Sequence, residues 1–429
     1  MTAPDRQPLV VVAAGGTGGH LFPAEALAVA LRRRGVRIDL VTDERATRYG
    51  EAFPADATHI VPSATFRGRD PASVLRTASV LGRGVLNAFR LFGRIAPAAV
   101  VGFGGYPTIP PVFAAALRRI PTIIHEQNGV PGRANRLLAS RASAIATGFP
   151  GVFGFDPRLA AKATHTGNPV RPAVVEAAGT AYPDMAGPFR LLVFGGSQGA
   201  RIMAEIVPPA VELLPVKLRA KIAIVQQARD EDLFPVRESY ARTGVPAEVR
   251  PFFRDLPARI AASHLVISRA GASTVAELAA IGRPAILVPL PHALDQDQMA
   301  NAGMLEKAGG ARRVKQASFT PEFLAAEIAR LTADAAMLPE MAAAAKTIGV
   351  VDAADRLADL VLKVAKITPR DPAPTAVAPP AGPAPADSAP AGPAPADPTL
   401  ADSTLADSPP AAPAAPDKAP DDGSAGPAN

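Results

Sequence analysis

The sequence contains no cysteine and no tryptophan, and only 5% of its residues are aromatic. Without cysteine the chain can form no disulfide, thiolate nucleophile or cysteine-ligated zinc site. No apolar run reaches the roughly 18 to 20 residues that a membrane-spanning helix needs, and the start "MTAPDRQP" lacks the pattern of a signal peptide. These absences predict a cytoplasmic protein.

Charge is spread unevenly along the 429 residues. The formal net charge is +6, but the segment from Thr368 onward holds eight Asp and only two basic residues, which leaves +12 on residues 1–367. A basic body of this kind suits an anionic partner such as a nucleotide, a nucleic acid or an acidic lipid headgroup. The tail is rich in Pro and Ala and repeats "PAGPAPAD" and "TLADS", so we expect residues 368–429 to be disordered.

The rest of the chain alternates short apolar runs with helical patterns, which is typical of parallel sheets with crossover helices. We predict two Rossmann-like doubly wound domains of the α/β class, at 1–167 and 168–352, then a helix at 353–367 that packs across them. The segment "TGNPVRPAV" (166–174) has the composition of an interdomain hinge. The predicted strands are 9–14, 38–42, 99–102, 122–125, 144–146, 190–194, 223–226, 265–267 and 285–288.

Each half opens with a strand, a glycine loop and a helix. The loops are "GGTGGH" (15–20) and "GGSQGA" (195–200). Glycines allow the backbone to approach a ligand closely, and the helix that follows offers unpaired N–H groups to an anion. Neither loop has the spacing of a dinucleotide fingerprint or the Gly-Lys-Ser/Thr of a P-loop, which weakens the dehydrogenase and ATPase hypotheses. Either loop could also be a tight connection without a ligand.

Only the first loop ends in a histidine. The dipole of the helix disfavours the cationic form of His20 in the first helical turn, so its ring can accept a proton as a general base. The structural alternative is a histidine that only caps the helix or binds a neighbouring carbonyl.

The densest polar pattern lies in "SRAGASTVAELAAIGRPAILVPL" (268–290). A helix that begins near Ser273 would direct the N–H groups of residues 272–274 at a phosphate. Glu277, one turn further on, could bind the hydroxyls of a ribose or merely complement the helix dipole. Asp295-Gln296-Asp297 formally matches the D-x-D of metal-dependent sugar transferases, but so short a pattern occurs often by chance.

Seven segments in order carry a family resemblance: "GGTGGHLFPAEALA", "GFGGYPTIP", "HEQNGVPGRANR", "TGNPVR", "FGGSQGARI", "SRAGASTVAELAAIGRPAILVPLP" and "NAGMLEKAGGA". Together they resemble the MurG-type UDP-N-acetylglucosamine transferases of peptidoglycan synthesis. The resemblance covers residues 9–365 and implies a GT-B fold with the active site between the domains.

The resemblance also implies the reaction. It is an inverting, metal-independent transfer of N-acetylglucosamine from UDP-GlcNAc to the C4 hydroxyl of the muramyl sugar of lipid I, which gives lipid II and UDP. No cofactor and no nucleic acid are implied. The expected partners are UDP-GlcNAc, lipid I, the anionic inner-leaflet surface and other cell-wall synthesis and division proteins. The expected location is the cytoplasmic face of the inner membrane, as a peripheral protein.

Site residues follow from the same resemblance. Its motifs place three residues on the acceptor side, with His20 as base and Tyr106 and Glu126 nearby. The implied donor residues are Gly16, Thr17 and Gly18 beside the donor, Asn128 at the donor sugar, Arg171 and Ser197 at the diphosphate or nucleotide, Phe253 at uracil, Ala272, Ser273, Thr274 and Glu277 at phosphate and ribose, and Gln298 at the sugar hydroxyls. The chain departs from the family at Asp-Gln-Asp-Gln, which leaves open whether Gln296 or Gln298 touches the sugar.

One further segment fits a membrane surface. Residues 71–97 interleave apolar side chains with arginines, so apolar groups could enter the headgroup boundary while the arginines meet acidic lipids. The alternative is an ordinary core helix with arginines on its solvent face, and we expect only part of the segment to touch lipid. The apolar residues are Leu75, Val80, Leu81, Leu86, Phe89 and Phe92, and the arginines are Arg76, Arg83, Arg90 and Arg94.

Two other functions remain open from sequence. One is a GT-B enzyme with a different acceptor, which the acceptor-half motifs "HEQN" and "GFGGYP" argue against because donor motifs are shared more widely. The other is a nucleotide-sugar-binding protein without activity, which a His20→Ala variant would distinguish by its turnover.

Overall fold

The computed structural model describes residues 7–15, 18–43, 53–65, 70–196, 199–291 and 296–369. All of them belong to one compact unit, Met1–Thr375. The expectations for Gly16, Thr17, Ser197 and Asp295, and for the tail from residue 370 onward, fall outside the described residues.

The first lobe is built on a parallel sheet of strands in the order β3-β2-β1-β4-β5-β6-β7. Its central strands are uninterrupted apolar runs such as LVVVA, because helices cover both faces of the sheet. The strands are β1 (Leu9–Ala13), β2 (Arg37–Thr42), β3 (Ala57–Ile60), β4 (Ala99–Gly102), β5 (Thr122–Glu126), β6 (Ala144–Thr147) and β7 (Ala163–His165).

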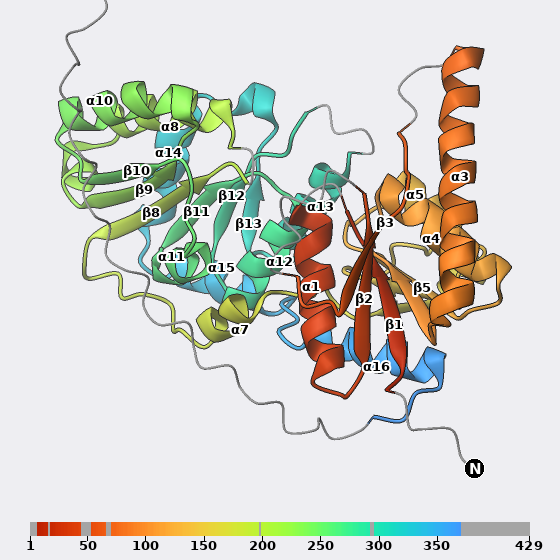
Figure 1. The fold of residues 1–429 in the computed structure, drawn as a ribbon. Coiled ribbons are helices and arrows are strands. Elements are labelled where there is room, and N and C mark those ends of the chain that lie inside the picture. Colours follow the sequence, from red (N-terminus) through yellow and green to blue (C-terminus); the bar gives the residue numbers. More distant parts are fainter. Residues whose placement is uncertain are drawn as a thin grey trace, which may run out of the picture. The chain divides into compact units, whose positions relative to one another are not determined.

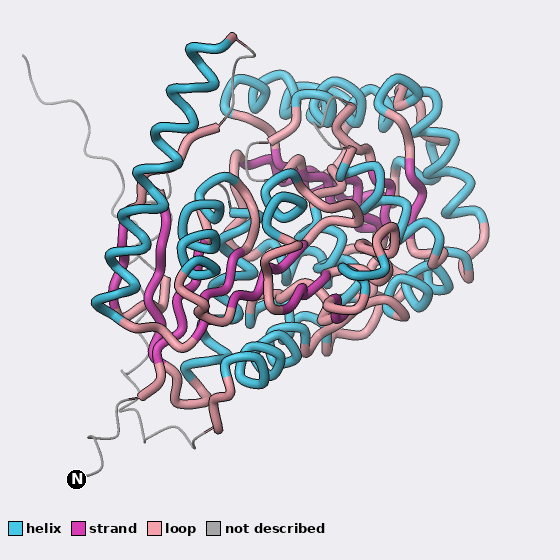
Figure 2. The backbone as a smooth tube through the Cα atoms, turned by 90° about the vertical axis from the view of Figure 1, so that its right-hand side faces the viewer, coloured by secondary structure: helices cyan, strands magenta, loops and turns pink. Residues whose placement is uncertain are grey.

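The helices of this lobe lie on both sides of the sheet, as Figures 1 and 2 show. Helix α3 packs along α4 and is capped by Asp70, whose carboxylate accepts a hydrogen bond from the Ser73 N–H. The helices are α1 (Gly18–Arg32), α3 (Pro71–Ile95), η2 (Tyr106–Thr108), α4 (Ile109–Leu117), α5 (Arg133–Leu138) and α6 (Pro157–Ala160). Helix α7 (Pro172–Ala178) follows them in the chain but packs on the second lobe.

The second lobe repeats the plan with a parallel sheet in the order β10-β9-β8-β11-β12-β13. Its strands are β8 (Phe189–Phe194), β9 (Ile222–Gln227), β10 (Ala247–Arg250), β11 (Leu265–Ser268), β12 (Ala285–Leu287) and β13 (Ala311–Arg313). Its helices are α8 (Arg201–Glu212), α9 (Val216–Arg219), η3 (Asp230–Asp232), α10 (Leu233–Thr243), α11 (Leu256–Ala262), α12 (Ala272–Ile281), α13 (Asp297–Lys307), η4 (Gln316–Ser318), α14 (Pro321–Ala333) and α15 (Met337–Lys346).

Both sheets confirm the predicted α/β class and its two doubly wound units, and all nine predicted strands are present. The strands that sequence missed are β3, β7, β10 and β13, which lie at the edges of the sheets. They are three or four residues long and partly exposed, so they lack the apolar run that marks a central strand. The predicted domain boundaries themselves stay a prediction.

The final helix returns to the first lobe. Helix α16 (Ala353–Ala365) packs on α1, and its buried face belongs to the same apolar cluster as β1 and β4. Arg34 at the end of α1 pairs with Asp355 at 2.8 Å and with Asp359 at 3.2 Å. The C-terminal helix therefore ties the end of the second lobe back to the first.

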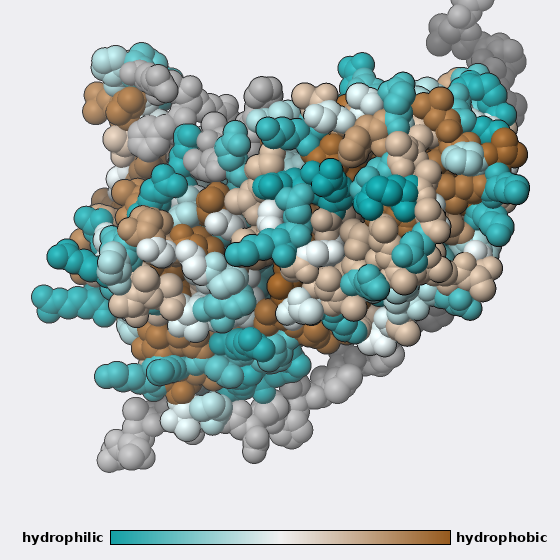
Figure 3. Space-filling view, turned by 180° about the vertical axis from the view of Figure 1, so that it is seen from behind, coloured by the Kyte–Doolittle hydropathy of each residue, from teal (hydrophilic) through white to brown (hydrophobic). Residues whose placement is uncertain are grey.

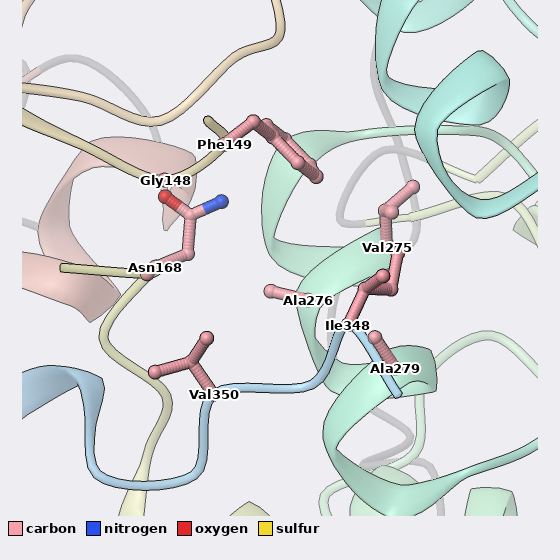
Figure 4. A pocket seen from close by; sticks show the side chains of 9 residues that line it. Gly148, Phe149, Asn168, Val275, Ala276, Ala279, Ile348 and Val350 are labelled. Carbon is pink, nitrogen blue, oxygen red and sulfur yellow. The ribbon is translucent and has the colours of Figure 1, made fainter. Parts of the chain in front are cut away.

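The chain passes between the lobes at two adjacent places. Gly167 on the first passage lies against Val350 on the second, and a Cβ added to Gly167 would stand 2.5 Å from the Val350 Cβ. Residues of both passages and of α12 close around a cavity of only about 10 Å³ (Figure 4). Gly167 also has φ of +80°, which favours glycine. The predicted hinge segment 166–174 thus includes one of these two closely packed passages.

Candidate active site

The strand order of each lobe reverses beside its first strand, which is where doubly wound sheets bind ligands. In the first lobe the crevice lies between the loop after β1 and the loop after β4. In the second lobe it lies between the loop after β8 and the loop after β11. The predicted site residues can be followed from these two crevices.

His20 is the third residue of α1 and lies in the first crevice. Its ring lies over the turn after β4, because a Cβ added to Gly105 would stand 3.4 Å from Nε2 and one added to Gly104 would stand 3.6 Å from Cε1. Both glycines have positive φ, so the turn that receives the imidazole depends on residues without a side chain. Tyr106 follows this turn directly, at the start of η2.

Burial lowers the pKa of His20, and the nearby polar groups of Gln127 and Phe103 oppose that shift. The direction agrees with the expectation that the ring is neutral. The largest cause of the lowered pKa is burial. Nδ1 of His20 is buried and has no hydrogen-bond partner among the described residues.

The four residues of "HEQN" each connect a different part of the molecule. The ring of His125, with its pKa lowered by burial to about 4, bonds the Gly167 carbonyl through Nε2 at 3.1 Å. Nε2 of Gln127 donates to the Phe103 carbonyl at 2.9 Å, and the carbonyl of Gln127 accepts from Asn168. His125 and Gln127 therefore hold the passage between the lobes.

Glu126 organises the loop that follows it. Its carboxylate is buried and accepts four hydrogen bonds, from the N–H and side chain of Asn128, the N–H of Gly132 and the side chain of Asn135. Burial raises the pKa of Glu126, and these four donors oppose the rise. All four lie in the loop or at the start of α5, so the geometry gives Glu126 a positioning task. Its predicted place near the acceptor stays a prediction.

The second lobe presents a helix N-terminus at the end of β11. Helix α12 begins at Ala272, and the N–H groups of Ala272, Ser273 and Thr274 have no acceptor within the helix. These three residues are partly exposed. The start at Ala272 agrees with the predicted helix start near Ser273, and it creates an anion-binding end.

Glu277, one turn into α12, is buried and pairs with Arg171 from the inter-lobe passage. Nη2 of Arg171 lies 3.1 Å from Oε1 of Glu277. Burial raises the pKa of Glu277, and Arg171 opposes the rise. The guanidinium of Arg171 also lies 4.7 Å from the centre of the Phe22 ring on α1. Arg171 therefore connects the second lobe to the helix that carries His20.

The structure places Gln296 and Gln298, the two candidates for the contact with the donor sugar, in different surroundings. Gln296 is exposed and sits at the cap of α13 with φ of +54°. Oε1 of Gln298 accepts from the N–H groups of Ala270 and Leu290, at 3.3 and 3.1 Å, beside the turn that opens α12. Gln298 is therefore fixed beside the start of α12, and which of the two residues contacts the donor sugar stays a prediction.

Asn301 is a residue that sequence reasoning did not single out. It is 0% exposed and lies one helical turn after Gln298 on α13. Its side chain bonds both lobes, reaching Asn128 and Gly129 in the first and Ala270 in the second. The signal available in sequence was the spacing of three residues from Gln298, which places both side chains on one helix face.

Phe253 lies apart from these contacts, at the start of the segment after β10. Its ring is buried under the guanidinium of Arg259, at 4.3 Å, whereas Phe252 is 61% exposed. The two phenylalanines line a depression of about 500 Å³ together with Arg250, Arg254, Asp255 and Arg259. The predicted contact of Phe253 with uracil stays a prediction.

Two searches of the described residues bear on other kinds of site. No group of three or more His, Asp or Glu side chains with the spacing of a metal site occurs within the described ranges. In the same part of the chain, no helix combines the length and the hydropathy that crossing a bilayer demands.

Comparison with known proteins identifies the family. The models of the glycosyltransferase family 28 N-terminal and C-terminal domains match residues 10–147 and 190–357. The chain is 63% identical over 362 residues, 84% of its length, to a UDP-N-acetylglucosamine--N-acetylmuramyl-(pentapeptide) pyrophosphoryl-undecaprenol N-acetylglucosamine transferase of Rhodopseudomonas palustris, and covers 99% of that relative. The chain belongs to this transferase family.

Other relatives agree. A transferase of the same name from Nitrobacter hamburgensis is 57% identical and 98% covered, and this chain is 84% covered. The crystal structure of Acinetobacter baumannii MurG aligns with a TM-score of 0.70 at 30% identity, over 83% of this chain and 99% of that one. The calicheamicin glycosyltransferase CalG4, with a TM-score of 0.59 at 17% identity over 83% of this chain and 99% of that one, shares the fold. The GT-B resemblance and the MurG-type family are confirmed.

Proposed function

We propose that this protein transfers N-acetylglucosamine from UDP-GlcNAc to the C4 hydroxyl of the muramyl sugar of undecaprenyl-pyrophosphoryl-MurNAc-pentapeptide, or lipid I. The products are lipid II and UDP, and the reaction belongs to peptidoglycan synthesis. The observation that carries the proposal is the imidazole of His20, whose pKa burial lowers, on a helix that Arg171 connects to helix α12 of the other lobe. Identity to relatives named for this transfer supports it.

On the donor side, the end of α12 receives the diphosphate and Glu277 receives the ribose hydroxyls. The N–H groups of residues 272–274 supply hydrogen bonds and the positive end of the helix dipole. Arg171 adds a full charge, and on donor binding it exchanges part of its contact with Glu277 for a phosphate oxygen. Uracil occupies the depression beside Phe253, and the N-acetylglucosamine faces Asn128 and Gln298. Gly16, Thr17, Gly18 and Ser197 complete the donor site in this proposal.

On the acceptor side, His20 acts as general base. Its ring takes the proton of the C4 hydroxyl while the oxygen attacks C1 of the donor sugar. The bond from O4 to C1 forms as the bond from C1 to the phosphate oxygen breaks on the opposite face, which inverts the configuration at C1. The electron pair leaves with UDP, and the proton passes from His20 to solvent. Tyr106, beside the turn that holds the imidazole, helps to seat the acceptor.

The transfer needs no divalent cation in this proposal, because fixed dipoles and Arg171 stabilise the charge that develops on the leaving diphosphate. Such groups are most effective where water is excluded and where they need no reorganisation during the reaction. Activity should therefore survive exhaustive treatment with a chelator.

Peripheral binding to the anionic cytoplasmic face of the inner membrane is part of the proposal, because lipid I is anchored there. Helix α3 supports it. Leu75 is 72% and Leu86 is 47% exposed, whereas Phe92 is buried, so only part of the helix has a free apolar face. The exposed arginines lie among these residues at 76, 83, 90 and 94. Figure 3 shows hydrophobic and hydrophilic residues interspersed on the face seen from behind.

The deciding experiment incubates the purified chain with radiolabelled UDP-GlcNAc and a short-chain lipid I analogue, with and without EDTA. We expect label in the lipid product from UDP-GlcNAc in both conditions and none from UDP-GalNAc. Equal transfer from UDP-GalNAc would refute the donor assignment. Activity lost in EDTA and restored by magnesium would refute the metal-independent mechanism.

A further inference from the structure

Asn301 joins three segments that the proposed site needs in register. Its Oδ1 accepts from the Gly129 N–H at 2.7 Å, and its Nδ2 donates to the Ala270 carbonyl and to Oδ1 of Asn128, both at 3.1 Å. Ala270 immediately precedes the turn that opens α12. One buried amide thus spans the loop of the first lobe and the helix end of the second.

The orientation of this amide is fixed by its backbone partners. A backbone N–H can only donate and a carbonyl can only accept, so Gly129 and Ala270 decide which end of the Asn301 side chain is oxygen and which is nitrogen. Nδ2 then presents its second hydrogen to Asn128. The partner atom on Asn128 must consequently be its oxygen.

Asn128 is held from its other end as well. Its Nδ2 donates to Oε1 of Glu126 at 3.2 Å. An amide carries two N–H donors and two acceptor lone pairs, so one donor and one lone pair of Asn128 remain for a ligand. Asn128 is partly exposed, whereas Asn301 is fully buried. Asn128, which faces the sugar in our proposal, is therefore oriented by Asn301, which is too deeply buried to touch the sugar.

We infer that Asn301 is a positioning residue, which sets the orientation of the Asn128 amide toward the donor sugar and couples it to the phosphate-binding end of α12. The inference rests on the proposed function. Through Asn301, the loop of Asn128 and Gly129 in the first lobe binds the second lobe only when the turn at Ala270 is in place. The two lobes therefore recognise the sugar and the diphosphate of the same donor molecule.

The close packing at this contact supports the assignment. A Cβ added to Gly129 would stand 3.3 Å from both the carbonyl carbon and the Cβ of Ala300, so the loop backbone lies directly on α13. Gln298 binds the N–H of Ala270 while Asn301 binds its carbonyl. One face of α13 therefore binds both backbone groups of Ala270, in the turn that opens α12.

The test compares Asn301→Ala, Asn301→Asp and Asn301→Ser. The Asp variant keeps the shape and the acceptor for Gly129, but it turns a second oxygen toward the oxygens of Asn128 and Ala270. We expect kcat/KM for UDP-GlcNAc to fall about 10- to 100-fold in the Asp variant, and we expect the Kd of UDP-GlcNAc to rise more than the Kd of UDP alone. The Ser variant perturbs the site less than the Asp variant does. The thermal midpoint of each variant shows whether that variant is folded.

A matched control lies on the same helix. Glu306→Ala removes the hydrogen bond to the Arg313 N–H and an ion pair with the same residue, at the other end of α13. It should lower the thermal midpoint without changing the ratio of UDP to UDP-GlcNAc affinity. A purely structural Asn301 would behave in the same way, and that result would overturn the inference.

A double-mutant cycle with Asn128→Ala isolates the coupling. If Asn301 acts through Asn128, the double variant loses little more than Asn128→Ala alone, whereas independent residues give additive losses. Additive losses with an active wild-type enzyme refute the inference and leave the proposed function intact. A wild-type protein that transfers no N-acetylglucosamine refutes the proposed function itself.

Discussion

The two lobes share a strand order but differ in the charged groups that line their crevices. In the first lobe, burial lowers the pKa of His20 and of His125 and raises the pKa of Glu126, which favours the uncharged form of each side chain. In the second, Glu277 is buried against Arg171. One crevice favours an uncharged ring that can accept a proton, and the other holds paired charges and helix dipoles.

The difference teaches that the fold supplies only the crevice. In our proposal, the residues that follow β1 and β4 equip the first crevice to accept a proton, and those that follow β8 and β11 equip the second to bind an anion. An enzyme that must both accept a proton and bind an anion can therefore use two copies of the doubly wound sheet. The predictions below ask whether the division between the lobes holds.

The largest effect is expected from His20→Ala. Removing the base should lower kcat by about 10²- to 10⁴-fold, while the Kd of UDP changes less than about 2-fold because the nucleotide belongs to the other lobe. Turnover and calorimetric UDP binding measure the two effects. His59→Ala, which breaks a 3.0 Å contact with Asp39 near the sheet edge, is the control and should keep its turnover. Unchanged turnover in His20→Ala would remove it from the base role.

The next effect concerns stability and pH in the first lobe. Burial lowers the pKa of His125 to about 4. Between pH 6.5 and 4, His125 is therefore protonated in the unfolded chain but neutral in the folded chain. The contribution of His125 to the free energy of unfolding is fully present above pH 6.5. It is lost as the pH falls toward 4, and the total loss is about 3 kcal/mol. His125→Gln, whose amide can still donate to Gly167, should flatten this dependence in urea unfolding between pH 4.5 and 7. Parallel slopes for the two proteins would contradict the assignment.

Arg171→Ala tests the second lobe. The change removes the charge that we propose for binding the donor diphosphate, and it leaves buried Glu277 without the Arg171 cation. We therefore expect kcat/KM for UDP-GlcNAc to fall about 10- to 100-fold. Unlike His20→Ala, it should weaken UDP binding as well. Steady-state kinetics and calorimetry distinguish the two variants, and an Arg171 variant that binds UDP normally would break the proposed division of labour.

The smallest effect is expected at the surface of α3. Leu75→Asp should reduce binding to vesicles that contain anionic lipid by about 3- to 10-fold and leave turnover of a water-soluble acceptor unchanged. Phe234→Asp provides a matched control, because Phe234 is 76% exposed on the second lobe. Equal loss in a vesicle flotation assay would show that the first lobe has no special affinity for the membrane.

Much of this architecture could be predicted from sequence. Central strands such as LVVVA are recognisable because burial on both faces requires a continuous apolar run. Edge strands such as ARR are not, because their pairing partner rather than their composition makes them strands. The neutrality of His20 was predicted in direction, but its largest cause, burial, depends on packing that the loop sequence does not contain.

The family motifs mark the residues that our proposal places at the site, but they do not mark all of the residues that hold those side chains in position. Asn301 is an ordinary amide in an ordinary helix, and its importance appears only when two lobes distant in sequence come together. The same holds for Glu126, whose four hydrogen bonds depend on how the loop folds back on itself. Spacing along a chain predicts neighbours on one element, but it cannot predict neighbours across a crevice.

The two adjacent passages between the lobes have a mechanical consequence. Since Gly167 and Val350 touch, the covalent links between the lobes are concentrated along one short line, and rotation about that line stretches neither of them. Other displacements, such as sliding or pulling the halves straight apart, would strain both links at once. Rotation about this line is therefore the relative movement of the lobes that the path of the chain opposes least.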